Sequence, residues 1–229
     1  MPLKDKKFWQ KLCTNEPKYG IILTILMETI NTNLIKEKHR RIVFELLLKL
    51  RLHSEESYLH SLDVAEKSLA LAYALGIKEE ELSKLYTASL LHDIGKIHVD
   101  EALLHKPNVT DYERELIRVG HIEGTRAILK EYFDEDLVRL ASHHHERLNS
   151  SGYPEHLNAT KLDILDRILQ VSDVTSALAM NRSYQGAYAP DQVIAILDNL
   201  VRRGELDKKC VKVIEKIFLE PLKDQAQPM

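Results

Sequence analysis

The chain of 229 residues has little glycine, little proline and almost no cysteine. Its 8 glycines and 7 prolines fall below average usage, which disfavours a turn-rich β fold and favours long helices. The only cysteines, Cys13 and Cys210, lie far apart and form no CxxC pair, so we expect two reduced thiols. The absence of a cysteine cluster also argues against a structural zinc site.

Strong charge and long apolar runs are absent as well. The net charge of -3, with histidine neutral, provides no electrostatic footprint for DNA or RNA. The longest apolar run, IILTILM at residues 21–27, stops at Glu28, well short of the ~20 residues that span a bilayer. Nothing near the N-terminus has the pattern of a signal peptide. We therefore expect a cytoplasmic protein that binds neither DNA, RNA nor membrane.

Helical periodicity fills most of the sequence instead. We expect helices over residues 21–30, 37–52, 58–75, 79–93, 135–146, 161–180, 190–203 and 207–218. Gly76 is expected to close the helix at 58–75, Thr110 and Glu113 form a capping-box pattern, and Asp134 is a candidate N-cap. No useful β alternation and no internal repeat is present, so the predicted fold class is all-α. Functional residues are expected in the longer connections at 94–109, 147–160 and 181–190.

Several of the 11 histidines occur beside carboxylates, at helix ends or in connections. Glu56 and His60 are four residues apart and therefore share a helix face. The segment HDIGK at 92–96 ends an apolar helix. Taken singly, each such residue is more often exposed at the surface, or buried in the core with its hydrogen bonds made by neighbouring groups. The further candidates are His121, the run 143–145 and Asp173, which interrupts a largely apolar segment.

As a set, these residues are harder to explain by folding alone. Buried imidazoles and carboxylates are costly unless they are paired or bound to a metal. Together they suit first-row divalent metals, and two ions bridged by a carboxylate need about this many ligands. Two such ions stabilise both the attacking and the leaving oxygen of an in-line displacement at phosphorus. Lys96 would then act as a point charge on a phosphate oxygen.

The motifs resemble those of the HD-GYP family of phosphodiesterases. HDxGK alone indicates only the broad HD superfamily of metal-dependent phosphohydrolases, but its combination with HHE and GYP at this spacing is specific. The resemblance implies an HD-superfamily helical bundle with additional N-terminal helices: residues 1–52 as an N-terminal helical extension and residues 53–229 as the HD-GYP domain. The matching residues, between about 53 and 219, are His60, HDIGK at 92–96, His121, HHERLNSSGYP at 144–154, Asp173 and RSYQ at 182–185.

The resemblance also implies an activity. It predicts a phosphodiesterase that hydrolyses cyclic di-GMP to linear pGpG, with GMP as a further product, through attack of a metal-bridging hydroxide on phosphorus. It implies two or three divalent ions, iron or manganese more than zinc. The implied ligands are His60, His92, Asp93, His121, His144, His145 and Asp173, with Asp93 bridging two ions and Glu56 beside a third. Asp93 and Lys96 are the implied catalytic residues, and Lys96, Tyr153, Arg182 and Gln185 the implied substrate contacts.

Four residues depart from the family pattern. Asn149 and Ser150 replace an Asp-Gly pair before SGYP, Ser176 replaces the second Asp of DxxDAL, and Gln185 replaces a cation. We interpret these changes as lying around the substrate rather than around the metals. They leave two alternatives open: an HD-type phosphohydrolase for another nucleotide, and a non-catalytic signalling module that binds metal or nucleotide.

Two further roles stay open from the sequence. Glu56 could help to hold a third ion, could orient His60 by accepting its other ring proton, or could be an exposed residue at a helix start. Residues 1–52 could pack onto the domain as additional core, or could form a surface for a homodimer or a signalling partner.

Overall fold

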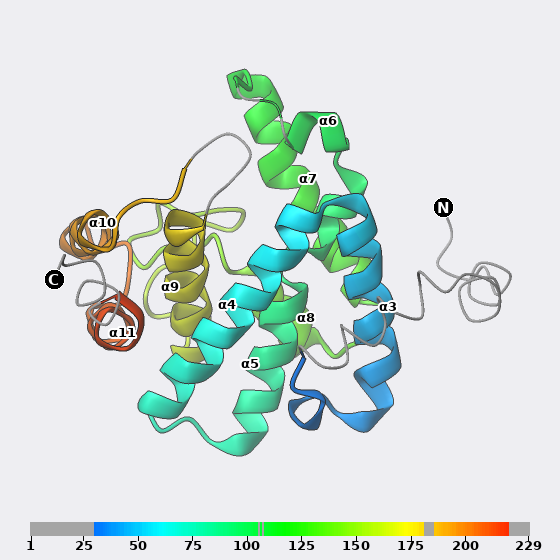
Figure 1. The fold of residues 1–229 in the computed structure, drawn as a ribbon, viewed down its shortest axis with the longest axis horizontal. Coiled ribbons are helices and arrows are strands. Elements are labelled where there is room, and N and C mark those ends of the chain that lie inside the picture. Colours follow the sequence, from blue (N-terminus) through cyan, green and yellow to red (C-terminus); the bar gives the residue numbers. More distant parts are fainter. Residues whose placement is uncertain (1–29, 105, 107, 181–185, 220–229) are drawn as a thin grey trace, which may run out of the picture.

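The structure, a computed structural model, describes residues 30–104, 106, 108–180 and 186–219, and confirms the all-α fold class (Figure 1). No strand occurs among these residues, and an isolated bridge pairs Asn149 with Asn158. The helix expected over 21–30 lies outside the described residues. The elements are η1 (Thr32–Leu34), α3 (Glu37–His53), α4 (Glu55–Ala74), α5 (Glu79–Leu91), η2 (Ile94–His98), α6 (Glu101–Leu104), α7 (Asp111–Leu129), α8 (Glu135–Ser142), α9 (Ile164–Ala179), α10 (Pro190–Arg202), α11 (Lys208–Ile214) and the π-helical turn η3 (Glu215–Leu219).

The core lies among α3, α4, α5 and α9. Figure 1 shows α4 and α5 side by side at the centre, with α3 on one flank and α9 on the other. Their facing sides bury Leu46, Leu71, Leu85 and Leu169 completely, and each such side chain contributes about 1.5–3 kcal/mol to folding. Since α3 shares this core, it behaves as the additional core considered for residues 1–52. The boundary at residues 52–53 stays a prediction.

Local signals fix the helix ends. α4 begins after Ser54, earlier than the start expected at residue 58, because the Ser54 hydroxyl accepts a hydrogen bond from the Ser57 amide at 3.1 Å. It ends before Gly76, whose φ of 73° lies in the left-handed region that glycine tolerates. Thr110 forms the capping box of α7 with Glu113. Asp134 caps α8 through the Leu137 amide.

Two expectations about connections need correction. Residues 94–109, expected to be a turn-rich connection, contain η2 and α6. The helix expected over 135–146 ends at Ser142, so the three histidines that follow leave it in a turn. In both places hydrogen bonds between residues three apart replace the α-helical bonds between residues four apart. Lys96 N–H donates to the Asp93 carbonyl at 3.0 Å, and His143 N–H donates to the Leu140 carbonyl at 3.3 Å.

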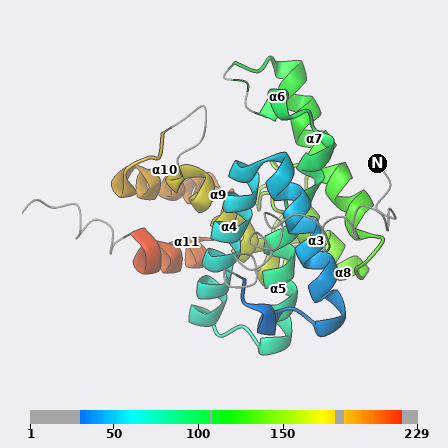
Figure 2. The same ribbon diagram turned by 45° about the vertical axis from the view of Figure 1, so that its right-hand side comes forward.

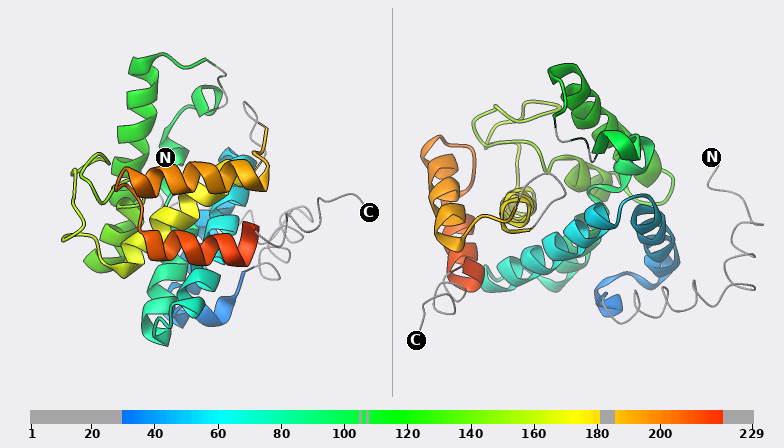
Figure 3. Two further views of the ribbon diagram at one scale, coloured as in Figure 1. Left: turned by 90° about the vertical axis from the view of Figure 1, so that its left-hand side faces the viewer. Right: turned by 45° about the horizontal axis from the view of Figure 1, so that its top comes forward.

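The outer helices leave one side of the bundle open. Figure 2 shows α6 and the first turns of α7 standing out from the bundle. Figure 3 shows α10 and α11 next to each other against α9, on a different flank. A pocket lies between α4, α6–α7 and α9. Within the described ranges, no helix has both the length and the apolar composition needed to cross a bilayer.

Candidate metal centre

All seven residues implied as metal ligands meet at one place in the fold. Six are buried, and the side chain of His145 is 24% exposed. The helices supply them from points far apart in the sequence, because the ends of α5 and α8 meet α4, α7 and α9 there. They are His60 on α4, His92 and Asp93 after α5, His121 on α7, His144 and His145 after α8, and Asp173 on α9.

These side chains form two groups of possible ligands. In each group the nitrogen and oxygen atoms lie within 4.8 Å of one another, close enough to surround a single ion. Asp173 lies between the groups, with Oδ1 3.0 Å from His60 Nε2 and Oδ2 3.7 Å from His145 Nδ1. The first group is His60, His92 and Asp93, and the second is His121, His144 and His145.

The two oxygens of Asp93 face different groups. Oδ2 lies 3.4 Å from His92 Nε2 and 3.9 Å from His60 Nε2. Oδ1 lies 3.9 Å from His121 Nε2 and 3.8 Å from His144 Nε2. A carboxylate that presents one oxygen to each group has the geometry required to bridge two ions.

Three histidines share a hydrogen-bond pattern typical of metal-binding imidazoles. Their Nδ1 atoms contact main-chain carbonyls, whereas their buried Nε2 atoms have no hydrogen-bond partner in the described part of the chain. An Nδ1–H donor fixes the tautomer in which Nε2 carries a free lone pair. The arrangement therefore fits a divalent ion. The pairs are His92 with Ser89 at 2.7 Å, His121 with Ile117 at 2.6 Å, and His144 with Ala141 at 2.7 Å.

Electrostatics favour the protonation states that bind a cation. Burial would raise the pKa of Asp93, but Lys96, whose Nζ lies 2.6 Å from Oδ2, and the ring of His92 hold that pKa well below its usual range. Burial lowers the pKa of His144 to about 3, so this ring is neutral at pH 7. His92 differs: burial lowers its pKa, but Asp93 beside it gives a net rise. Metal binding at such a site is expected to release a proton.

Comparison with known proteins identifies the family of this fold. Residues 31–210 match the HD domain family. The chain belongs to this family. The HD domain is 37% identical over 162 residues to 3'3'-cGAMP-specific phosphodiesterase 1 of Vibrio cholerae, an alignment that covers 70% of this chain and 38% of that protein. It is 33% identical over 150 residues to the cyclic di-GMP phosphodiesterase PA4108 of Pseudomonas aeruginosa, covering 65% and 36%. The chain thus spans less than two fifths of the length of these relatives.

Solved structures with the same fold include Bd1817, an HDG"Y"P protein from Bdellovibrio bacteriovorus. The two superpose with a TM-score of 0.58 at 23% identity, over 69% of this chain and 51% of that one. At this identity the likeness concerns the fold alone. Together with the family match, it confirms the helical HD architecture. The relatives named as cyclic dinucleotide phosphodiesterases confirm the resemblance that the motifs predicted.

Thr125 holds the HD motif of this domain against α7, and no sequence pattern pointed to it. Its hydroxyl donates to the His92 carbonyl at 3.0 Å and accepts from the Gly95 amide at 3.0 Å. The backbones approach so closely that a Cβ added to Gly95 would overlap the His121 carbonyl oxygen and the Thr125 amide nitrogen. This contact fixes His92 and His121, which come from different elements, relative to each other.

Glu146 organises a loop rather than the metal centre. Its completely buried carboxylate accepts hydrogen bonds from the amides of Glu155 at 2.6 Å and Leu157 at 2.8 Å. The loop that it holds carries Tyr153, whose ring stacks on His145 with 4.8 Å between centroids and 28° between planes. The sequence placed Glu146 beside histidines but did not reveal this supporting role.

His143 turns away from the other two histidines of its run. Its Nδ1 lies 3.3 Å from an oxygen of Asp166, and that carboxylate also binds Arg139 at 2.8 Å. Asp166 is completely buried, so this network satisfies a charge inside the fold. The geometry agrees with leaving His143 out of the predicted ligand set.

A pocket of about 580 Å³ opens beside the candidate metal centre. Its size falls within the roughly 300–1,000 Å³ of typical small-molecule sites. Lys96 and Tyr153, two of the predicted substrate contacts, line this pocket, and so does Glu56. Arg182 and Gln185, the other two, lie outside the described residues.

The departures from the family pattern do not all surround the substrate. Ser176 Oγ lies 2.9 Å from His60 Nδ1, so Ser176 supports a candidate metal ligand, and the interpretation that these changes avoid the metals is wrong for it. Asn149 Oδ1 accepts from the amide of Ser151 at 3.1 Å, and Ser150 has a φ of 65°, where glycine would be less strained. These two residues shape the loop backbone. The His60–Ser176 contact joins residues 116 apart, which a sequence motif does not reveal.

Replacing Ser176 by alanine is expected to weaken metal binding roughly 10–100-fold, because the hydroxyl orients the ring of His60. Calorimetric titration of the metal-depleted protein with Mn²⁺ measures the change. Ser172→Ala is the matched control, because Ser172 is a buried serine one turn earlier on α9 whose hydroxyl has no partner within the described chain. Equal affinities in the two variants would contradict the positioning role.

Proposed function

We propose that this HD domain is a metal-dependent phosphodiesterase that hydrolyses cyclic di-GMP to linear pGpG, with GMP as the product of a second cleavage. The observation that carries the proposal is Asp93, whose two oxygens face separate groups of histidines. The buried Nε2 atoms without partners support a pair of ions there. The names of the curated relatives support a cyclic dinucleotide as the substrate class.

The ligand set suits iron or manganese, because it combines imidazole and carboxylate without thiolate. A pair of such ions supplies Lewis acidity and an activated water for in-line displacement at phosphorus. Glu56, which lines the pocket one helical turn before His60, is proposed to hold a third ion. His60, His92, Asp93 and Asp173 would hold one ion of the pair, and Asp93, His121, His144 and His145 the other.

The chain's own groups would bind and orient the phosphodiester beside these ligands. Lys96 lines the pocket with its Nζ 2.6 Å from Asp93 Oδ2, so its charge stands between the carboxylate and an incoming phosphate. Tyr153 lies across the pocket on the ring of His145. Arg182 and Gln185 are proposed as further substrate contacts.

Replacing Lys96 by alanine is expected to lower turnover roughly 10–150-fold, which corresponds to the loss of one charge-assisted contact worth about 1.5–3 kcal/mol. Metal content should stay near the wild-type value, because Lys96 is not a ligand. Elemental analysis and steady-state kinetics on the same sample measure both. Lys84→Ala, which breaks a surface pair with Asp136 at 2.9 Å, is the control. If the Lys96→Ala variant also loses its metal, the role proposed for Lys96 is wrong.

Turnover of a nucleotide panel by anaerobically purified protein of known metal content tests the function itself. The panel contains cyclic di-GMP, 3'3'-cGAMP and nucleotides of other classes. The relative from Vibrio cholerae favours 3'3'-cGAMP as the second candidate, and preference for it would assign that substrate instead. Bound metal with no turnover of any nucleotide would support the non-catalytic signalling module.

A cytoplasmic location and a contact surface within residues 1–52, for a homodimer or a signalling partner, also stay proposals. The described part of that segment contains η1 and most of α3, and Leu52 near the end of α3 is 49% exposed. Light scattering of the purified chain tests the homodimer, with a monomer at all concentrations as the contrary result.

A further inference from the structure

Two of the three arginines on α7 line the pocket and have no part in the proposed reaction. Arg114 and Arg118 line the same pocket as Lys96. We propose that they form a subsite for the second phosphodiester of a cyclic dinucleotide, the one that is not being cleaved. The inference rests on the proposed function, because it requires a substrate that contains two phosphodiesters.

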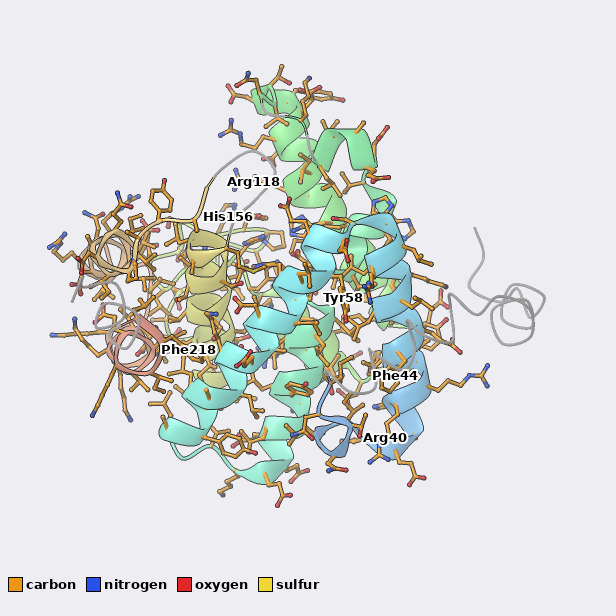
Figure 4. The ribbon with its side chains drawn as sticks, viewed as in Figure 1. Arg40, Phe44, Tyr58, Arg118, His156 and Phe218 are labelled. Carbon is orange, nitrogen blue, oxygen red and sulfur yellow. The ribbon has the colours of Figure 1, made fainter. Side chains whose placement is uncertain are left out.

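The position of the arginines along α7 places them next to the candidate metal centre. Arg114, Arg118 and His121 are spaced at i, i+4 and i+7, so they share one face of the helix. Along the axis, Arg118 lies about 4.5 Å and Arg114 about 10.5 Å from His121, from the rise of an α-helix. Figure 4 labels Arg118 beside α7, on the side where α9 lies. One helix face thus runs from a candidate metal ligand outward along two positive charges.

The charge of these arginines is available to a ligand. Lys96 and Lys106 also line the pocket, but each already pairs with a carboxylate, at 2.6 and 2.7 Å. Among the described residues, the only carboxylate paired with Arg118 is that of Glu115, at 3.5 Å, and the Glu115 side chain is 61% exposed. Arg114 is exposed and pairs with no carboxylate in the part of the chain that the structure describes.

Tyr153 holds Arg118 in place. The guanidinium carbon lies 4.1 Å from the centroid of the Tyr153 ring, which in turn stacks on His145. Burial raises the pKa of Tyr153, so the ring stays a neutral phenol at physiological pH. A guanidinium stacked on an aromatic ring keeps its N–H groups at the edge free for the two oxygens of a phosphate. Tyr153 therefore connects the candidate metal centre to the proposed subsite.

The surroundings explain why a second phosphate would need these charges. Leu103, Leu104 and Val109, from α6 and the connection to α7, line the pocket too. A phosphate anion beside apolar side chains is unfavourable unless a cation pairs with it. The metal centre and Lys96 would serve the phosphate that is cleaved. Arg147 also lines the pocket, but its guanidinium already donates to the carbonyls of His144 and Glu146 at 3.1 and 2.7 Å, so we assign the second phosphate to Arg114 and Arg118.

The test compares two substrates in the variant Arg114→Gln/Arg118→Gln. Cyclic di-GMP has two phosphodiesters, whereas bis(p-nitrophenyl) phosphate has one and cannot occupy both subsites. We expect kcat/KM for cyclic di-GMP to fall roughly 10–100-fold further than kcat/KM for bis(p-nitrophenyl) phosphate. Arg202→Gln, at an exposed arginine on α10, is the matched control and should change neither value. With Arg118→Lys in place of Arg118→Gln, part of the loss should be recovered, because the charge remains while the planar stacking is lost.

Binding to the metal-depleted protein gives a readout that does not depend on turnover. There the double variant should bind cyclic di-GMP at least tenfold more weakly than wild type, and the difference should shrink with added salt. Equal losses on both substrates, or no loss of binding, would overturn the subsite. If wild type cleaves bis(p-nitrophenyl) phosphate but no cyclic dinucleotide, the proposed function fails, and the binding measurement still decides whether the arginines hold the ligand.

Discussion

Replacing Asp93 by asparagine is expected to remove the ions from the HD domain and to abolish hydrolysis. The amide keeps the volume of the side chain but loses its charge and one of the two oxygens that face the histidine groups. The loss of activity should exceed the roughly 10–100-fold cost of removing a group that only supports a ligand. Metal content per chain and turnover of cyclic di-GMP measure the effect.

Asp136→Asn is the matched control for this substitution, because Asp136 pairs with Lys84 at the surface and does not line the pocket. The Asp93→Asn protein should remain folded, since Lys96, left without its partner, is 17% exposed and is able to reach water. Thermal unfolding checks this point. Full activity of the Asp93→Asn variant would refute the assignment of Asp93 as a metal ligand. Normal metal content without activity would mean that Asp93 acts on the substrate and does not hold the ions.

A methyl group at Gly95 is expected to have the largest effect on stability. Its Cβ would overlap backbone atoms of His121 and Thr125, which cannot rotate away as side chains do. Gly95→Ala should therefore lower the free energy of unfolding by about 3 kcal/mol, the upper end of the range for overpacking, or more. α7 would have to move from η2 and take His121 away from Asp93, so metal affinity should fall too. Urea denaturation and Mn²⁺ titration measure the two effects.

Gly120→Ala provides the contrast to Gly95→Ala. Gly120 lies within α7 next to His121, and a Cβ there meets nothing within 4 Å. Alanine is favoured over glycine in a helix by up to about 1 kcal/mol, so this variant should be slightly more stable than wild type. The two glycine-to-alanine changes should shift stability in opposite directions. Similar results would show that α7 tolerates displacement from the HD motif.

The fold class and three of the helix ends were predictable because they depend on short-range patterns. Thr110 with Glu113, Asp134 and Gly76 each act on the turn beside them, and the structure places each at the predicted end. The short helices after Asp93 were not predictable, because bonds between residues three apart and packing against α7 decide them. Local sequence does not specify either condition.

The sequence predicted which side chains meet at the candidate site, but it did not predict which residues orient them. Spacing and motif resemblance singled out the seven side chains that meet in the fold, and the role of each as a ligand stays a prediction. The contacts that orient them were beyond the sequence, because Ser176 meets His60 and Thr125 meets His92 across long separations. Arg118 escaped notice for the same reason, since only folding brings it onto the ring of Tyr153.

Main-chain carbonyls hold the rings of His92, His121 and His144, and this has a consequence for how the centre tolerates mutation. A carbonyl oxygen is present whatever amino acid occupies position 89, 117 or 141, so sequence drift there leaves these three lone pairs directed as before. His60 depends instead on the hydroxyl of Ser176, which one codon change removes. The orientation of His92, His121 and His144 is therefore insensitive to substitution of the residues that hold them. The orientation of His60 is sensitive, so substitution at position 176 is a way in which natural variation changes metal affinity.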